Sequence, residues 1–203
     1  SPIAVSDDMS IYSGELTVNN NITSNNSGSD VLFNSSNITL NAPITSSGTS
    51  TVTINSTGNV IDGINGSFVG KIISTNLLLT GNGNFNLDST TNNVSIISAG
   101  SNASRLGSLN FTNSNALVVG SVGSNSGIYT IGTIAISTLT GDLSVSQNIN
   151  TQNTSTTALI LNASQSTVAG VSSGGDLKFS GGASITIGAN ARAKLYSGSI
   201  SGS

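Results

Sequence analysis

The sequence predicts an all-β fold: a right-handed parallel β-helix (solenoid) of about eight coils of roughly 22–26 residues each. Three observations support this prediction. Apolar residues recur two positions apart, which places both on one face of a strand. These pairs return at a long fixed period, as in repeat proteins. Charged residues make up only 6% of the 203-residue chain, and there are two prolines.

The repeat is clearest in residues 107–145, where four apolar pairs mark four short strands. Corresponding pairs return after roughly 25 residues, and Gly, Ser and Asn fill the gaps. The four pairs are Leu109 with Phe111, Leu117 with Val119, Ile134 with Ile136, and Leu143 with Val145.

Two series of strands extend this unit along the chain. The first series starts at Leu16, Ile38, Val60, Phe85, Leu109, Ile134, Leu159 and Ile185. The second starts at Val31, Val52, Leu77, Val94, Leu117, Leu143 and Val168. Further short strands are expected at Ile72, Ile96, Ile128 and Ile149. An antiparallel sandwich is the alternative, but hairpins would not require a phase of about 25 residues.

Residues 1–13 show no period, and we expect them to lead into the first coil, with Ile3, Val5, Ile11 and Tyr12 lying over it. Residues 14–203 are the predicted β-helix. Residues 174–203 carry much of the charge and are the expected last coil. The start at Ser1-Pro2 has no signal-peptide pattern, which indicates a fragment of a longer protein.

Stacking explains the unusual composition. Equivalent side chains of stacked coils lie about 4.8 Å apart, where two like charges repel by roughly 3–4 kcal/mol at an effective dielectric of 20. Neutral Asn, Ser and Thr avoid this repulsion, and their amides and hydroxyls can form ladders. Glycines suit corners that need a positive φ; those expected at corners are Gly81, Gly83, Gly100, Gly107, Gly120, Gly123, Gly127, Gly132, Gly141, Gly170, Gly174, Gly175, Gly181, Gly182 and Gly188.

Composition also excludes several kinds of function. The chain has no cysteine and no histidine, which removes thiolate metal sites, disulfides and the commonest general base. Five Lys and Arg residues cannot form a basic patch for nucleic acid. No apolar run approaches the roughly 20 residues needed to span a bilayer.

Three stretches resemble the repeat region of filamentous-haemagglutinin-type adhesins, the large bacterial proteins of two-partner secretion. They are residues 107–151 (GSLNFTNSNALVVGSVGSNSGIYTIGTIAISTLTGDLSVSQNINT), residues 38–61 (ITLNAPITSSGTSTVTINSTGNVI) and residues 172–203 (SSGGDLKFSGGASITIGANARAKLYSGSISGS). The resemblance covers roughly residues 14–203. It implies a right-handed β-helix in a very large protein that a partner transporter exports across the outer membrane of a Gram-negative bacterium. Adhesion, aggregation or biofilm structure would be its role. The high Asn content departs from the family.

Catalysis on such a scaffold would need clustered carboxylates, and two within about 5–10 Å for glycoside hydrolysis. Most acids stand alone beside predicted turns, where Asp bonds its own backbone. Asp62 and Asp88 are separated by one period of the repeat and could stack in adjacent coils. The acids are Asp7, Asp8, Glu15, Asp30, Asp62, Asp88, Asp142 and Asp176. We expect turn roles, no enzyme activity and no cofactor.

Other ligand signals are weak. Asp7-Asp8 offers too few oxygens for calcium. Thr51 and Thr53 form one TxT pair, but Thr130, Thr133, Thr138 and Thr140 are too irregular for an ice-binding array. Residues 120–127 match no phosphate loop, because no helix pattern follows. The Asn-x-Ser/Thr signals barely exceed chance, and we expect no glycosylation; they lie at Asn21, Asn25, Asn34, Asn37, Asn55, Asn65, Asn93, Asn102, Asn110, Asn153 and Asn162.

The sequence therefore favours a structural or adhesive stalk segment of a secreted bacterial surface adhesin or biofilm-matrix fibre. The alternative is a carbohydrate-binding or weak glycan-processing module on the same scaffold, but only three Tyr and five Phe are available to stack on sugars. Exposed strand edges at the two rod ends would also favour end-to-end association of copies.

Overall fold

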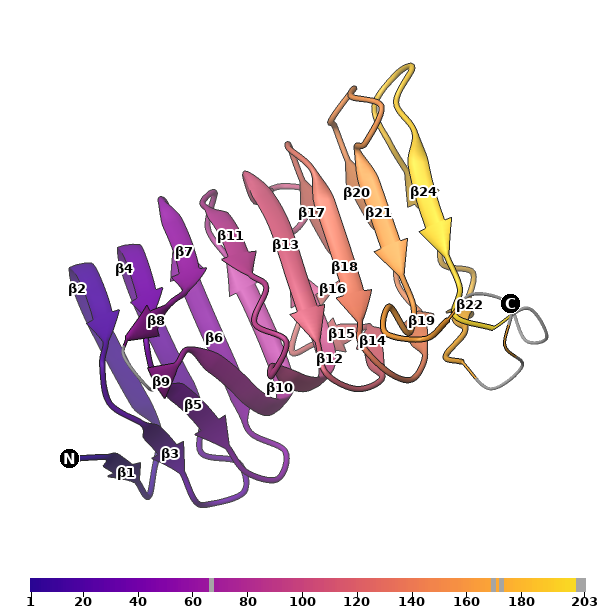
Figure 1. Cartoon of the computed structure of the whole chain (residues 1–203). Helices are drawn as coiled ribbons and strands as arrows, with labels where there is room; N and C mark the ends of the chain where they lie inside the picture. Colours follow the sequence, from indigo (N-terminus) through magenta and orange to yellow (C-terminus); the bar gives the residue numbers. More distant parts are fainter. Residues whose placement is uncertain (66–67, 169–170, 172–173, 200–203) are drawn as a thin grey trace.

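The computed structural model describes residues 1–65, 68–168, 171 and 174–199. Within these residues the chain forms strands and no helix, and the strands of the main sheet pair in parallel with the next coil. The stack advances from β2 to β24, which lie at opposite ends of it (Figure 1). The predicted parallel β-helix is confirmed, and the antiparallel sandwich is excluded. The right-handed sense stays a prediction from the crossover preference.

Every coil passes through three faces in the same order, and each face is a ladder of strands (Figure 1). Face 1 consists of β1 (Ile3–Val5), β3 (Ile22–Ser24), β5 (Pro43–Ser46), the start of β10 (Lys71–Thr80), β12 (Asn93–Ala99), β14 (Leu117–Val119), β19 (Leu143–Val145) and β22 (Leu177–Phe179).

Face 2 follows in each coil. It consists of the start of β2 (Met9–Val18), the start of β4 (Val31–Leu40), β6 (Thr51–Ser56), the end of β10, the end of β12, β17 (Ile128–Thr130), β20 (Ile149–Thr151) and β23 (Ile185–Thr186). Face 3 consists of the ends of β2 and β4, β7 (Asn59–Asp62), β11 (Asn84–Leu87), β13 (Ser108–Asn113), β18 (Ile134–Thr138), β21 (Leu159–Asn162) and β24 (Ala193–Tyr196).

The first predicted series is the inward column of face 3, in register at every position but the last. The members in register are Leu16, Ile38, Val60, Phe85, Leu109, Ile134 and Leu159. The steps between them stay within the predicted period, and they are shorter before Val60 than after it. The last position is wrong: Leu159 pairs with Ala193, whereas Ile185 lies on face 2 opposite Ile149. The longer connection after β21 shifts the phase.

The second predicted series follows one ladder of parallel strands but not one inward column. The ladder runs through β4, β6, β10, β12, β14 and β19. Val31, Val52 and Leu77 are in register, and their column continues through Ile97, Val119 and Val145 instead of the predicted Val94, Leu117 and Leu143. Val168 belongs to no strand and is 77% exposed. The further strands expected at Ile72, Ile96, Ile128 and Ile149 are present as parts of β10, β12, β17 and β20.

The segment expected to lead into the first coil is already part of the stack. β1 pairs in parallel with β3 through Ile3, and β2 pairs with β4 from Met9 onwards. Ile11 faces inward opposite the buried Phe33, whereas Tyr12 lies opposite Asn34 and is 68% exposed. The first coil therefore begins at Ile3.

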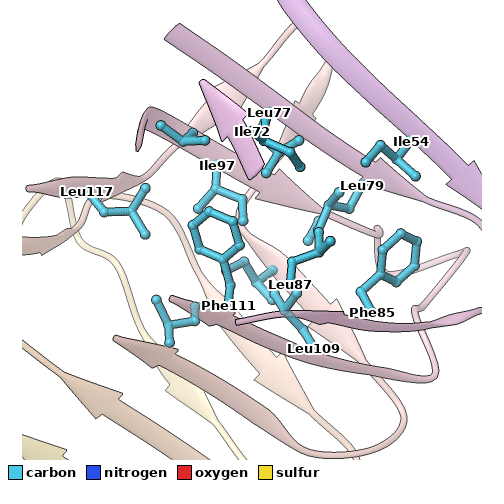
Figure 2. Packing of buried hydrophobic residues seen from close by; sticks show 14 of the residues in the cluster. Ile54, Ile72, Leu77, Leu79, Phe85, Leu87, Ile97, Leu109, Phe111 and Leu117 are labelled. Carbon is cyan, nitrogen blue, oxygen red and sulfur yellow. The ribbon is translucent and has the colours of Figure 1, made fainter. Parts of the chain in front are cut away.

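The core is one continuous column of side chains from all three faces. Figure 2 shows Ile72 and Leu117 from face 1, Leu77 and Leu79 from face 2, and Phe85 and Phe111 from face 3 pointing toward one another. Inward residues alternate with half-buried or exposed ones along each strand, as in β6 and β18. Each coil is too thin to bury its own apolar side chains, so neighbouring coils do so.

Polar side chains form the ladders that the composition predicts. Amide nitrogens donate to amide oxygens of the preceding coil from Asn41 to Asn19 (2.9 Å) and from Asn110 to Asn86 (2.7 Å). Asn55 lies in a ladder of three, between Asn34 and Thr80. These contacts follow the rod axis, so each depends on the coil beside it.

Buried asparagines close the corners between faces 3 and 1. Asn113 is fully buried, and its Oδ1 accepts the Val94 N–H at 2.8 Å. Its Nδ2 donates to the carbonyl oxygens of Val94, Asn115 and Ala116 at 3.0–3.1 Å. The side chain thus satisfies backbone groups that leave the ladder at the bend.

Glycine serves two purposes at the corners. Seven of the predicted corner glycines have a positive φ: Gly81, Gly100, Gly123, Gly127, Gly141, Gly181 and Gly182. Gly83, Gly107, Gly120, Gly132, Gly174, Gly175 and Gly188 do not, and Gly170 lies outside the described residues. Gly83 belongs instead to a stacked column with Gly58 and Gly107, and a Cβ on it would lie 2.2 Å from the Gly58 oxygen. Close backbone approach is the second reason for glycine here.

In the described part of the chain, two hairpins leave the stack and return to it. β8 (Ile64–Asn65) pairs antiparallel with β9 (Phe68–Val69), and β15 (Ser121–Val122) with β16 (Asn125–Ser126). Each is closed at its base by a hydrogen bond between two glycines, from Gly70 N–H to the Gly63 oxygen and from Gly127 N–H to the Gly120 oxygen. The ladder resumes after each closure.

Candidate functional site

Asp62 and Asp88 lie in adjacent coils, as their spacing predicts. The Asp62 carboxylate, at the end of β7, accepts the backbone N–H groups of Asp88 (3.1 Å) and Ser89 (2.8 Å). The Asn92 side chain donates to it at 3.2 Å. Burial raises the pKa of Asp62 and outweighs the hydrogen bonds that lower it. Both oxygens thus hold the turn that follows β11 in the next coil, whereas the sequence predicted a hydrogen bond to the backbone of the acid's own turn.

A second acidic pair joins the last coil to the coil before it. Asp142 Oδ1 accepts the Asp176 backbone N–H at 2.9 Å. The Lys178 Nζ lies 2.6 Å from Asp142 Oδ2 and 3.7 Å from Asp176 Oδ2. The Asp176 backbone hydrogen bond lowers the pKa of Asp142, and Lys178 lowers it further. The pKa of Lys178 is raised, chiefly by its bond to Asp142. The cation therefore stabilises two carboxylates that the stack brings together.

Arg105 connects three coils, a role that sequence reasoning did not identify. It lies in the connection between β12 and β13, and its Nη1 donates to the Thr130 carbonyl oxygen (3.2 Å) and to Asn150 Oδ1 (2.8 Å). Its Nη2 donates to Asn102 Oδ1 at 2.6 Å. The guanidinium lies 5.5 Å from the centre of the Tyr129 ring, within cation–π range. All of these contacts are made to groups of the same chain, so Arg105 holds neighbouring coils together.

The Asp7-Asp8 pair also makes structural hydrogen bonds. Asp7 Oδ1 accepts the Asp8 N–H, and Asp8 Oδ1 accepts the Asp30 N–H of the next coil, both at 2.9 Å. Asp30 repeats the arrangement toward Thr51 at 2.7 Å. Among the described residues, no three His, Cys, Asp or Glu side chains group together to hold a metal ion.

Several Asn-x-Ser/Thr positions use their amides within the fold. The side-chain nitrogens of Asn37, Asn55 and Asn110 donate to the preceding coil, and Asn102 accepts from Arg105. The side chain of Asn65 lies outside the described part. A sugar on a laddered amide would break the ladder.

The threonines form no flat array. Thr51 and Thr53 are half-buried on β6, but Thr130 and Thr138 are buried. Residues 120–127 form the β15–β16 hairpin, so no helix follows this glycine-rich run.

The two ends of the rod expose apolar side chains. At the first coil a cavity of about 230 Å³ opens among Ile3, Ile11, Leu16 and Val18, and Ile3 is 46% exposed. At the last coil, Phe179 and Leu195 are 45% and 48% exposed. Exposed large apolar side chains also occur between these coils, at Ile61, Val69, Ile131 and Val168.

No helix among the described residues is long and apolar enough to cross a membrane. Comparisons with protein-family models, with curated proteins and with solved structures gave no match to this chain.

Proposed function

We propose that this chain is a structural or adhesive stalk segment of a secreted bacterial surface adhesin or biofilm-matrix fibre. The observation that carries the proposal is the unbroken aliphatic column beneath parallel ladders on three faces. Each coil is bonded to its neighbours by backbone and side-chain hydrogen bonds along the rod axis. A rod built in this way resists bending and can hold other domains away from a surface.

The side chains that could perform chemistry support a mechanical role. Asp62, Asp142 and Arg105 each bond to a neighbouring coil. The polar atoms of these three side chains hold turns in place. Among the residues that the structure describes, no two carboxylates face a groove. The chain is proposed to have no enzymatic activity and no cofactor.

The resemblance to filamentous-haemagglutinin-type repeats supplies the cellular setting of the proposal. It implies export through a partner transporter in the outer membrane of a Gram-negative bacterium and an extracellular location. The absence of cysteine agrees with passage of an unfolded chain through a pore, since no disulfide has to be avoided.

A glycan array probed with the purified chain tests the proposal against carbohydrate binding. The chain should show no saturable binding to host or matrix polysaccharides and should release no sugar from them. A well-characterised lectin on the same array provides the positive control. Saturable binding that Tyr12→Ala or Tyr196→Ala abolishes would contradict a purely mechanical role, since these tyrosines are 68% and 49% exposed and tyrosine rings can pack on sugars.

A further inference from the structure

One inward column of face 1 is polar in three successive coils. Ser24 pairs with Ser46 in the parallel ladder, and Ser74 occupies the same position in the next coil. These residues, here called the serine column, are 0%, 7% and 6% exposed. Valines continue the column on both sides, because Val5 pairs with Ser24 and Val94 pairs with Ser74. A run of buried hydroxyls is therefore set between apolar side chains.

The outer two members of the serine column bond to the backbone of their own coils. Ser24 Oγ donates to the Ser29 carbonyl oxygen at 2.9 Å, and Ser74 Oγ donates to the Asn76 carbonyl oxygen at 3.0 Å. A hydroxyl has one O–H group and two lone pairs. Both oxygens can therefore still accept hydrogen bonds.

The hydroxyl of Ser46 differs, because it is buried and has no hydrogen-bond partner among the described residues. The connection from Ser24 to Val31 is one residue longer than that from Ser46 to Val52, although Val31 and Val52 are in register. The shorter connection brings no carbonyl oxygen to Ser46 in the way that Ser29 comes to Ser24. A buried polar group without a partner is costly, which points to a ligand that supplies one.

The spacing of the column fits a water molecule between neighbouring hydroxyls. Stacked side chains repeat at about 4.8 Å, which is too long for a direct hydrogen bond between two oxygens. Two hydrogen bonds of about 2.8 Å that meet at the tetrahedral angle of a water molecule span about 4.6 Å. The column offers neutral hydroxyls and no carboxylate, so it suits water better than a metal cation.

We propose that the serine column binds two ordered water molecules, one between Ser24 and Ser46 and one between Ser46 and Ser74. The Ser46 O–H donates to one water, and the Ser46 oxygen accepts from the other. Ser24 Oγ and Ser74 Oγ each accept from the water beside them. This hydration site lies beyond the stalk function: it links three coils inside the rod, as the amide ladders link coils on its surface.

Crystallography and solution relaxation measurements on the whole chain test the proposal. A high-resolution crystal structure should show, for each neighbouring pair of the column, a water about 2.8 Å from both serine oxygens. Oxygen-17 magnetic relaxation dispersion, which counts long-lived bound waters, should detect the same two waters in solution.

Ser46→Val and Ser29→Ala form a matched pair of variants. Valine extends the apolar column of Val5 and Val94, so Ser46→Val should lose both waters in both measurements. Ser29→Ala also removes the hydroxyl of a residue that is 7% exposed, but it leaves the serine column intact. It should retain both waters.

Ser46→Ala separates a water-bound hydroxyl from an unpartnered one. If the waters are bound, the variant loses hydrogen bonds, and its ratio of folded to unfolded chain should fall about fivefold. An unpartnered hydroxyl would make alanine neutral or stabilising, because the variant removes the cost of burying a polar group. Urea denaturation followed by circular dichroism measures the ratio and checks that the variant keeps its strands.

A crystal structure with no water in the column, or with a direct bond from Ser46 Oγ to a backbone oxygen, would overturn the proposal. The same number of long-lived waters in the wild type and in Ser46→Val, or a Ser46→Ala variant at least as stable as the wild type, would do so as well. Loss of both waters in Ser46→Val, with both retained in Ser29→Ala, would support it.

Discussion

The middle of the rod and its last coil are built from the same strand pattern but differ in burial and charge. Phe85 and Phe111 in the middle coils are 1% and 0% exposed, whereas Phe179 in the last coil is 45% exposed. The outward ladder position that holds Asn86 and Asn110 in the middle holds Lys194 at the end. The last described coil is thus less buried and carries more charge than the middle coils.

Two aspartates show the same contrast in electrostatic terms. Asp62 in the middle is partly buried beside Asp88, and burial raises its pKa. Asp142, at the junction with the last coil, has its pKa lowered by the Asp176 N–H and by Lys178. The surroundings therefore destabilise the ionised form of the same residue type in one region and stabilise it in the other.

The largest expected effect comes from a matched pair of phenylalanine truncations. Phe111→Ala should lower the free energy of unfolding by about 3–5 kcal/mol, because it opens a cavity among side chains from three faces. Phe179→Ala should cost less than about 1 kcal/mol, since much of that ring already contacts water. Urea denaturation followed by circular dichroism measures both. Equal losses would show that the last coil is packed as tightly as the middle.

A pair of introduced charges tests the argument from neutral ladders. Asn110 donates to Asn86 at 2.7 Å, and Asn86→Asp/Asn110→Asp would replace this bond by two stacked carboxylates. At about 4.8 Å two like charges repel by roughly 3–4 kcal/mol at an effective dielectric of 20, and exposure to solvent reduces this energy. The double variant should therefore lose stability, and added salt should restore part of it. Asn86→Asp/Asn110→Lys is the control and should unfold near the wild-type midpoint; equal damage in both variants would contradict charge repulsion.

The smallest expected effects are two pH dependences of opposite sign. Because the pKa of Asp62 is raised in the folded chain, the protonated form of this side chain favours folding. The resulting stabilisation is fully present below the ordinary pKa of 3.8 and is lost as the pH rises through the pKa of the folded chain. Because the pKa of Asp142 is lowered in the folded chain, its ionised form favours folding. This stabilisation is fully present above 3.8 and is lost as the pH falls through the pKa of the folded chain. The stability advantage of the wild type over Asp62→Asn should thus shrink above about pH 4, and that over Asp142→Asn below it. Urea midpoints across the acidic range up to neutrality measure both slopes; slopes of the same sign would contradict the contrast.

The fold was predictable because alternation and period are local properties of the chain. The column from Leu16 to Leu159 could be read from the sequence, since its members are large, apolar and evenly spaced. The proximity of Asp62 and Asp88 followed from the same spacing. The face 1 column of Ile22, Ile44 and Ile72 was missed as a series, because its strands are short and show little alternation.

Other features required the stacked structure. Arg105 bonds Thr130 and Asn150, which are 25 and 45 residues away. Such sequence separations predict a contact only once the register between the coils is known. The phase shift that moved Ile185 to face 2 arises from a connection whose length no apolar pattern marks. The sequence pattern therefore predicts the repeating part of the coil better than the connections.

The hydrogen bonds between two glycines at the base of each hairpin make the geometry of the rod independent of the length of the hairpin. Because Gly63 bonds Gly70 and Gly120 bonds Gly127 at the base, the chain re-enters the ladder at the same point whatever lies between. Both segments could therefore become longer without a change of register in the inward columns, provided that the buried Val122 of β15 keeps its contacts. The same two positions are natural places to graft a foreign peptide or enzyme, spaced at a known interval along a rigid support.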